Sequence, residues 1–152
     1  MKTILISIAA GCLLAALATA QTPSYTITDL GTLGGTYSYG FGINAAGEVS
    51  GGAATKFQTG GLSQTAFLWY RGNMTNLGTL GGLNSDAGGP NASGEAAVLS
   101  ETSMADPNGE DFCEFGTHQQ CRGVIWKDGV WTVLPNLGAV LNAAPFDLNN
   151  RG

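Results

Sequence analysis

The feature of this sequence that most constrains its fold is an internal repeat. The motif Leu-Gly-Thr-Leu-Gly-Gly begins at Leu30 and returns 47 residues later at Leu77; a degraded copy begins at Leu134, a further 57 residues along. Repeats of this length are typical of arrays of small units, each of which buries its apolar face against the next. We therefore expect units at about 29–75 and 76–132, and the start of a third at 133–152.

Two further motifs recur in the same order and mark the turns. Asn at the first position and Gly at the fourth suit a type I turn, and this pattern begins at Asn44, Asn91 and Asn149. Two-residue hairpin loops are expected at one shared place in the repeat, at Arg71-Gly72 and Asp128-Gly129. The excess length of the second unit is an insertion at about 99–121.

Short apolar or alternating runs lie between the turns and predict β-strands. The expected strands are 25–29, 40–44, 48–53, 65–70, 73–77, 87–90, 95–100, 122–126 and 130–134. About four strands per unit predict an all-β fold, a β-propeller-like repeat of short antiparallel sheets. A β-sandwich and a stacked β-solenoid are the competing architectures, and they explain the similar units and the several turns in each unit less well.

The number of units is small for a propeller. A closed propeller typically has four or more blades, whereas this sequence contains two units and the opening of a third. We therefore expect an incomplete propeller and a chain that is a piece of a longer protein. Unpaired strands at its edges would favour self-association.

The N-terminus is expected to be a secretory signal peptide, residues 1–20, that forms a signal helix. Lys2 precedes an apolar run that ends in the small-residue cleavage site Ala18-Thr19-Ala20. The run is too short and too rich in Ala and Thr to span a membrane, and a lipoprotein anchor at Cys12 is the weaker alternative. The β-repeat domain would then be 21–152, secreted to an extracellular or periplasmic location and without a membrane span after signal removal.

The charge limits the kinds of partner that the chain is expected to bind, and the cysteine content indicates its cellular compartment. Without Lys2 the mature chain carries five cationic and eleven acidic side chains, a net charge of −6. It has no basic stripe, so we expect no binding to nucleic acid. Cys113 and Cys121 remain after signal removal and are expected to form a disulfide in an oxidising compartment. With only His118 nearby, they make a poor zinc site.

The repeat motifs resemble the bacterial extracellular repeats of the HAF family. The resemblance covers about 29–152 and rests on Asp29-Leu30-Gly31-Thr32-Leu33-Gly34-Gly35, Gly42-Ile43-Asn44, Gly47-Glu48-Val49 and Ala66-Phe67-Leu68-Trp69. The His-Ala-Phe tripeptide that names the family is imperfect, because Thr65 replaces His and the second unit has Gly123-Val124 in place of Ala-Phe. The resemblance implies a secreted bacterial repeat protein and supplies no catalytic residues to carry over.

The insertion is acidic, and two interpretations of it stay open. Asp106, Asn108, Glu110 and Asp111 place oxygen ligands around a Gly turn, as a calcium loop does. They lack the full spacing of such a loop and its distant bidentate Glu. The sequence therefore favours a solvated loop held by the disulfide over a calcium site, and no other cofactor is indicated.

The candidate catalytic side chains have simpler explanations. His118, the single histidine, has no nucleophile motif beside it and is expected at the surface. Asp29, Asp86 and Asp147 are the carboxylates from which a glycosidase pair could be drawn. Asp29 recurs as Asn76, which favours a hydrogen-bonding role in a turn.

The tryptophans fall into two groups, according to whether they recur at the same place in the repeat. Trp69 and Trp126 occupy one place in the repeat, so we expect them in the core. Trp131 aligns with Met74 and is the better candidate for a surface aromatic that stacks on sugars.

We therefore expect a secreted, non-enzymatic repeat protein that serves as a structural or interaction module for a surface glycan or a protein. The alternative is a fragment of a propeller-type carbohydrate-active enzyme whose catalytic groups lie partly in other units.

Overall fold

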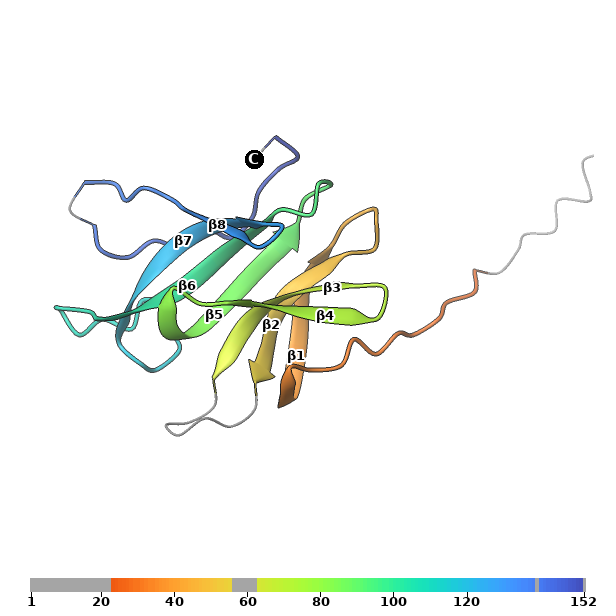
Figure 1. The fold of residues 1–152 in the computed structure, drawn as a ribbon, viewed down its shortest axis with the longest axis horizontal. Coiled ribbons are helices and arrows are strands. Elements are labelled where there is room, and N and C mark those ends of the chain that lie inside the picture. The colour runs from red at the N-terminus through yellow and green to blue at the C-terminus, as the bar shows by residue number, and fades with distance from the viewer. Residues whose placement is uncertain (1–22, 56–62, 139, 152) are drawn as a thin grey trace, which may run out of the picture.

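The computed structural model describes residues 23–55, 63–138 and 140–151, and these contain eight strands and no helix. The strands form two antiparallel four-stranded sheets that follow one another along the chain (Figure 1). The first sheet contains β1 (Gly34–Ile43), β2 (Val49–Thr55), β3 (Gln64–Tyr70) and β4 (Asn73–Gly78). The second contains β5 (Gly81–Pro90), β6 (Ala96–Ala105), β7 (Gln119–Lys127) and β8 (Val130–Val133). The predicted all-β class is confirmed, while the signal peptide at 1–20 lies outside the described residues.

Both sheets are meanders whose turns have the geometry that the repeat predicts. Arg71 and Gly72, between β3 and β4, have φ angles of 49° and 88°, and Asp128 and Gly129, between β7 and β8, have 49° and 83°. Positive φ at both positions defines the hairpin turn whose twist matches that of the strands. The turns that begin at Asn44 and Asn91 close with hydrogen bonds of 3.0 and 3.1 Å from the fourth residue to the first.

The Leu-Gly-Thr-Leu-Gly-Gly motif forms the same loop in front of each sheet. Asp29 Oδ1 accepts a hydrogen bond from the Gly31 N–H at 2.9 Å, and Asn76 Oδ1 accepts one from Gly78 at 2.8 Å. A short polar side chain that bonds two residues ahead stabilises such a turn. The expected turn role of Asp29 is therefore confirmed, because Asn76 makes the same bond.

Several strand boundaries differ from the sequence-based expectation. The strand expected at 25–29 is wrong: residues 23–32 form no strand, and those before the motif run away from the sheets without a hydrogen-bonded neighbour (Figure 1). β1 and β5 begin six residues earlier than expected, because bulges allow their Gly-rich starts to pair with β2 and β6. β6 and β7 extend into the expected insertion at 99–121, so that only 106–118 lie outside strands.

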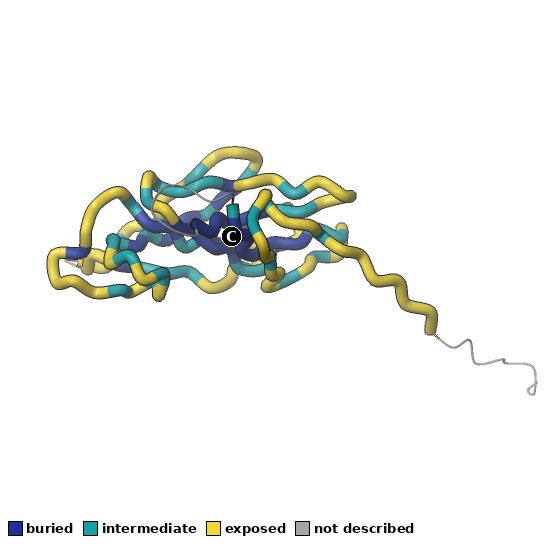
Figure 2. The backbone as a smooth tube through the Cα atoms, turned by 90° about the horizontal axis from the view of Figure 1, so that it is seen from below, coloured by how far each residue is buried: buried dark blue, intermediate teal, exposed yellow. Residues whose placement is uncertain are grey.

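The core lies where β5 packs against the first sheet, and buried residues gather in the middle of the molecule (Figure 2). Ala66 of β3 belongs to the cluster between the sheets, whereas its neighbour Phe67 belongs to a second cluster. Successive residues of a strand point to opposite faces, so the first sheet is apolar on both sides.

The two tryptophans that share a place in the repeat have matching surroundings. Trp69 packs against Val49 and Phe67, and Trp126 clusters with Ala96 and Val124, which occupy the same places one unit later. Core packing is confirmed for both. Trp131 is not the surface aromatic we expected: it pairs with Trp126 across β7 and β8 and is partly buried against the same cluster.

Candidate functional site

Consecutive units are joined by the same side-chain hydrogen bond twice. Asn44 Nδ2 donates to the backbone carbonyl of Asn91 at 2.8 Å, and Asn91 Nδ2 donates to the carbonyl of Asn149 at 3.2 Å. Each asparagine opens its unit's Asn-x-x-Gly turn. The turns at Asn44 and Asn91 and the segment at Asn149 are therefore stacked in sequence, each bonded to the next.

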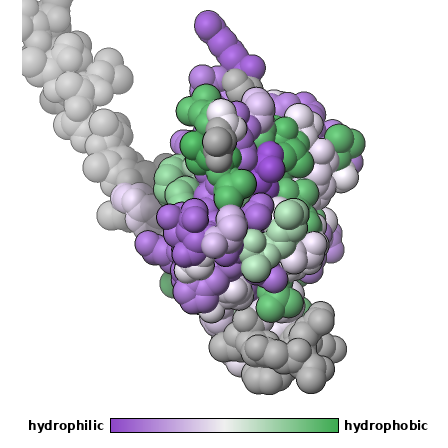
Figure 3. Space-filling model, turned by 90° about the vertical axis from the view of Figure 1, so that its left-hand side faces the viewer, coloured by the Kyte–Doolittle hydropathy of each residue, from purple (hydrophilic) through white to green (hydrophobic). Residues whose placement is uncertain are grey.

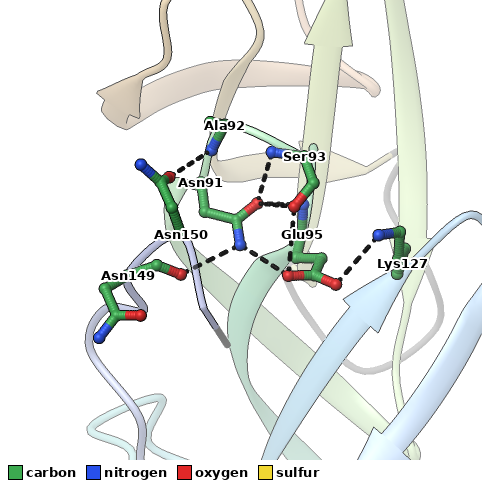
Figure 4. Close-up of polar contacts among 7 residues, drawn as sticks. All are labelled: Asn91, Ala92, Ser93, Glu95, Lys127, Asn149 and Asn150. Carbon is green, nitrogen blue, oxygen red and sulfur yellow. Dashed lines mark hydrogen bonds and ion pairs between the residues drawn. The ribbon is translucent and has the colours of Figure 1, made fainter.

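Figure 4 shows the second of these junctions. Asn91 Oδ1 accepts hydrogen bonds from the N–H groups of Ser93 and Glu95, at 2.9 and 3.0 Å, which order the turn. Asn91 Nδ2 also donates to the Glu95 carboxylate at 2.6 Å, and Lys127 Nζ lies 3.1 Å from the same carboxylate. The bonds from Asn91 and Lys127 hold the pKa of Glu95 below its ordinary value.

A second type of bond also repeats between units. The backbone N–H of Gln64 in β3 donates to Asn84 Oδ1 at 3.1 Å, and that of Cys121 in β7 donates to Asn142 Oδ1 at 2.9 Å. Gln64 and Cys121 occupy equivalent places in the two sheets. Residues 140–151 are therefore attached to the second sheet as β5 is attached to the first.

A groove of about 650 Å³ opens where β1, β5 and the segment after β8 meet. It is lined by the end of β1 and its turn, by β5 and its turn, and by the segment after β8: residues 41–45, 86–92, Leu99, 145–148 and Asn150. Glycines allow the backbones to meet there, because a Cβ on Gly42 would lie only 2.7 Å from the Cα of Gly89. The groove is thus a product of the stacking of units.

A polar cluster adjoins the groove at the junction between the two sheets, and Gln64 and Asp86 are its buried members. The Tyr39 hydroxyl donates to Asp86 Oδ2 at 2.6 Å, Gln64 Nε2 donates to the same oxygen at 3.1 Å and to the Tyr39 hydroxyl, and the Tyr37 hydroxyl donates to Gln64 Oε1 at 3.1 Å. Gly52 leaves space for the cluster, because its Cβ would lie 2.8 Å from the Tyr39 oxygen. Strands from both sheets are therefore needed to form it.

The ionisation of this cluster is strongly perturbed. Asp86 is 8% exposed, and burial raises its pKa from 3.8 to about 6 against the lowering effect of its hydrogen bonds. Burial and the neighbouring Asp86 raise the pKa of Tyr39 above its ordinary value. Tyr39 therefore acts as a neutral hydrogen-bond donor at pH 7.

An aromatic row on β1 leads from the cluster into the groove. Tyr37, Tyr39 and Phe41 alternate along the strand, and alternate residues share a face. The Tyr37 and Tyr39 rings are stacked with centroids 6.3 Å apart, and the Tyr39 and Phe41 rings meet edge to face at 5.3 Å. Phe41 is 65% exposed, so the row ends in an accessible ring at the groove.

The candidate calcium residues of the insertion are engaged in other bonds or dispersed. Asp106 Oδ1 accepts from the N–H groups of Asn108 and Glu110, and its Oδ2 accepts from Asn142 at 2.8 Å. Asp111 Oδ2 accepts from the Gly116 N–H. Within the parts of the chain that the structure describes, no three His, Cys, Asp or Glu side chains lie close enough to hold a metal ion.

The remaining sequence-predicted residues of the insertion lie as expected. Cys113 and Cys121 form the disulfide, with their Cα atoms 6.1 Å apart. His118 is exposed, and its Nδ1 lies 3.0 Å from the carbonyl oxygen of Gly109. The side of the molecule that carries this loop has several separate hydrophobic patches among polar residues (Figure 3). It offers no continuous apolar surface on the residues shown there.

Of the three carboxylates considered for glycoside hydrolysis, the structure brings two to one place. Asp86 and Asp147 both line the groove, whereas Asp29 does not. The sequence-based search missed Tyr39, Phe41 and Phe146, which also form the site. The sequence does contain a signal for these three residues, because they occupy positions at which the copies of the repeat carry different residues.

Comparisons with known proteins add no assignment. The chain matches no protein-family model, no curated protein and no solved structure. The resemblance to the HAF family therefore stays a prediction. In the described residues, no helix is long and apolar enough to cross a membrane.

Proposed function

We propose that this chain is a secreted repeat protein that acts as a non-catalytic interaction module and binds its ligand in the groove between units. The observation that carries the proposal is the repeated junction: the bond from Asn44 to Asn91 is made again from Asn91 to Asn149. A junction used twice defines a regular array, and the groove forms where the first segments of its units converge.

We further propose that the array is of the propeller type, within the HAF family. Two features support this arrangement: each sheet is a four-stranded antiparallel meander, and the first strand of the second sheet packs against the first sheet. Propellers repeat such sheets radially, and their first strands surround a central channel. The groove would be a part of that channel.

The chemistry of the groove supports binding over catalysis. Its lining, among the described residues, has no Ser, Thr, Cys, His or Lys, so the two carboxylates Asp86 and Asp147 are its titratable side chains. Secretion is supported by the disulfide between Cys113 and Cys121, since such bonds persist in oxidising compartments.

An NMR titration of the isotopically labelled chain with neutral sugars, organic cations and carboxylates tests the binding proposal. At least one class is expected to shift the backbone amides of Gly42, Gly88 and Gly89, which line the groove. If every class leaves these amides unmoved, the groove is not a binding site and the proposal fails.

The second candidate function is glycoside hydrolysis, and one observation favours it: Asp86 and Asp147 face one groove, and the pKa of Asp86 is raised to about 6. A raised pKa suits a general acid. Nitrophenyl glycosides assayed with the chain and with Asp86→Asn would detect this activity; turnover that the substitution abolishes would replace the non-catalytic proposal.

A further inference from the structure

The groove has a definite charge character. Its lining contains two carboxylates, Asp86 and Asp147, and no Lys, Arg or His among the described residues. Asp147 is exposed, and one of its oxygens accepts a hydrogen bond from the N–H of Leu148 at 2.8 Å. An anionic groove without a basic residue disfavours phosphates and carboxylates as ligands and favours cations.

The partners of Asp86 explain why a cation would be stabilised there. Among the described residues, the partners of this carboxylate are neutral groups: the Tyr39 hydroxyl on β1, the Gln64 amide on β3 and the Ala87 N–H. Tyr37 contacts the cluster and Asp147 lines the groove, and neither of these further titratable groups is cationic. A buried carboxylate without a counter-charge is costly, and a cationic partner offsets that cost.

Two phenyl rings provide the apolar part of the site. Phe41 of the first unit and Phe146 of the segment after β8 are 65% and 82% exposed, and both line the groove. Exposed rings beside carboxylates suit an apolar or aromatic body that carries a positive charge, because ring faces attract cations and bury apolar surface. A volume of about 650 Å³ is typical of a small-molecule site.

The hydrogen-bonding capacity of the groove argues against a sugar. Asn44 and Asn91 line it, but both use their amide N–H and carbonyl groups within the turns and junctions. Asn150 Oδ1 accepts the N–H of Ala92 at 2.9 Å. Few side-chain amides are therefore left to recognise hydroxyl groups.

We propose that the groove binds organic ammonium groups carried on an apolar or aromatic body, with Asp86 and Asp147 as counter-ions and Phe41 and Phe146 as ring walls. This inference rests on the proposed binding function and names its ligand class. The ligand is a free amine or the ammonium-bearing side chain of a peptide, and both present the same chemistry to the groove.

Phenethylammonium chloride, titrated into the labelled chain at pH 7.5 and low salt, tests the inference, with 2-phenylethanol as the neutral control of similar shape. The cation is expected to shift the amides of Gly88 and Gly89 and to bind at least about tenfold more tightly than the alcohol, because hydrogen bonds to charged groups are stronger than those between neutral groups. Binding should weaken severalfold at pH 5, where protonation of Asp86 removes a counter-ion.

Three variants sharpen the test. Asp86→Asn and Asp147→Asn should each weaken phenethylammonium binding severalfold, and Asp147 is exposed, so its substitution leaves the fold intact. Asp29→Asn is the matched control, because Asn76 already performs the turn role of Asp29, and it should leave binding unchanged. Competition with phenethylammonium by a peptide that carries a benzylated lysine would indicate that the ligand is a peptide side chain. The absence of competition would indicate that the ligand is a free amine.

The outcomes separate this inference from the proposal beneath it. Equal affinity for phenethylammonium and 2-phenylethanol, or unchanged binding in both groove variants, overturns the ammonium site. If neutral sugars shift the groove glycines and phenethylammonium does not, the inference fails and the interaction module stands. If no class of compound binds, both fail together.

Discussion

The bonds between stacked turns predict that Asn91→Asp destabilises the chain without removing the turn itself. The substituted carboxylate keeps an oxygen where Asn91 Oδ1 accepts from the N–H groups of Ser93 and Glu95. The second carboxylate oxygen takes the place of Asn91 Nδ2, the donor that bonds the Glu95 carboxylate at 2.6 Å and the Asn149 carbonyl at 3.2 Å. Both contacts change from attractive to repulsive.

The magnitude follows from burial and from the bonds lost. Asn91 is 5% exposed, so water can replace few of the hydrogen bonds that the substitution removes. The loss of two hydrogen bonds at roughly 1 kcal/mol each, together with the repulsion of facing oxygens, gives about 2–3 kcal/mol. In a domain of this size, that corresponds to a fall in Tm of about 8–12 °C.

Thermal and urea unfolding, followed by circular dichroism at pH 7, measure the effect. Asn108→Asp is the matched control, because Asn108 is exposed and lies in the insertion loop, and it should change stability by less than about 0.5 kcal/mol. If Asn91→Asp is no more destabilising than this control, the stacked junction does not hold the units together, and the argument from the repeated bond is refuted.

Three further predictions follow. The pKa of Asp86 is raised from 3.8 to about 6, so the protonated carboxyl contributes its full stabilisation of the fold below pH 4, and this contribution is lost as pH rises through 6. Asparagine does not titrate, so the stability of Asp86→Asn relative to the unsubstituted chain should rise between pH 4 and pH 8. Urea unfolding should show a rise of up to about 3 kcal/mol. Cys113→Ser should cost about 2–3 kcal/mol in thermal unfolding, because the loop closed by the disulfide spans only eight residues. In a eukaryotic secretory host, glycopeptide mass spectrometry should find glycan on exposed Asn73 and none on buried Asn91, although both lie in Asn-x-Ser/Thr sequons.

The turns were predictable because their residues encode the backbone geometry. Gly47 and Gly94 have φ angles of 82° and 74°, which other residues rarely adopt, so the fourth position of each turn is recognisable in the sequence. The central strands were predictable for a similar reason, since their apolar residues need cover on both faces. Local chemistry therefore determined the positions of the turns and of the central strands within each unit.

The boundaries that failed depend on partners that a local pattern does not reveal. The alternation at 25–29 is suited to a strand, but no neighbouring strand lies beside it, and strand structure requires such a neighbour. The starts of β1 and β5 contain Gly and appear unsuited to strands, yet they pair through bulges at Gly34 and Gly81. Trp131 was misplaced because its burial depends on its cross-strand pairing with Trp126.

The carboxylates Asp86 and Asp147 were predictable as candidates, whereas the aromatic residues of the site were not, because a repeat pattern reveals the places where the copies agree. Tyr39 and Asp86 are 47 residues apart, so they occupy one place in consecutive units, and the structure bonds them directly at 2.6 Å. A residue that stabilises every unit must recur in every unit, whereas a groove formed once, where three segments converge, needs different side chains from each. Phe41 and Gly88 differ in the same way, and both line the groove. In a repeat of this kind, agreement between copies therefore identifies the scaffold, and disagreement along the first strand of each unit identifies residues that line the groove.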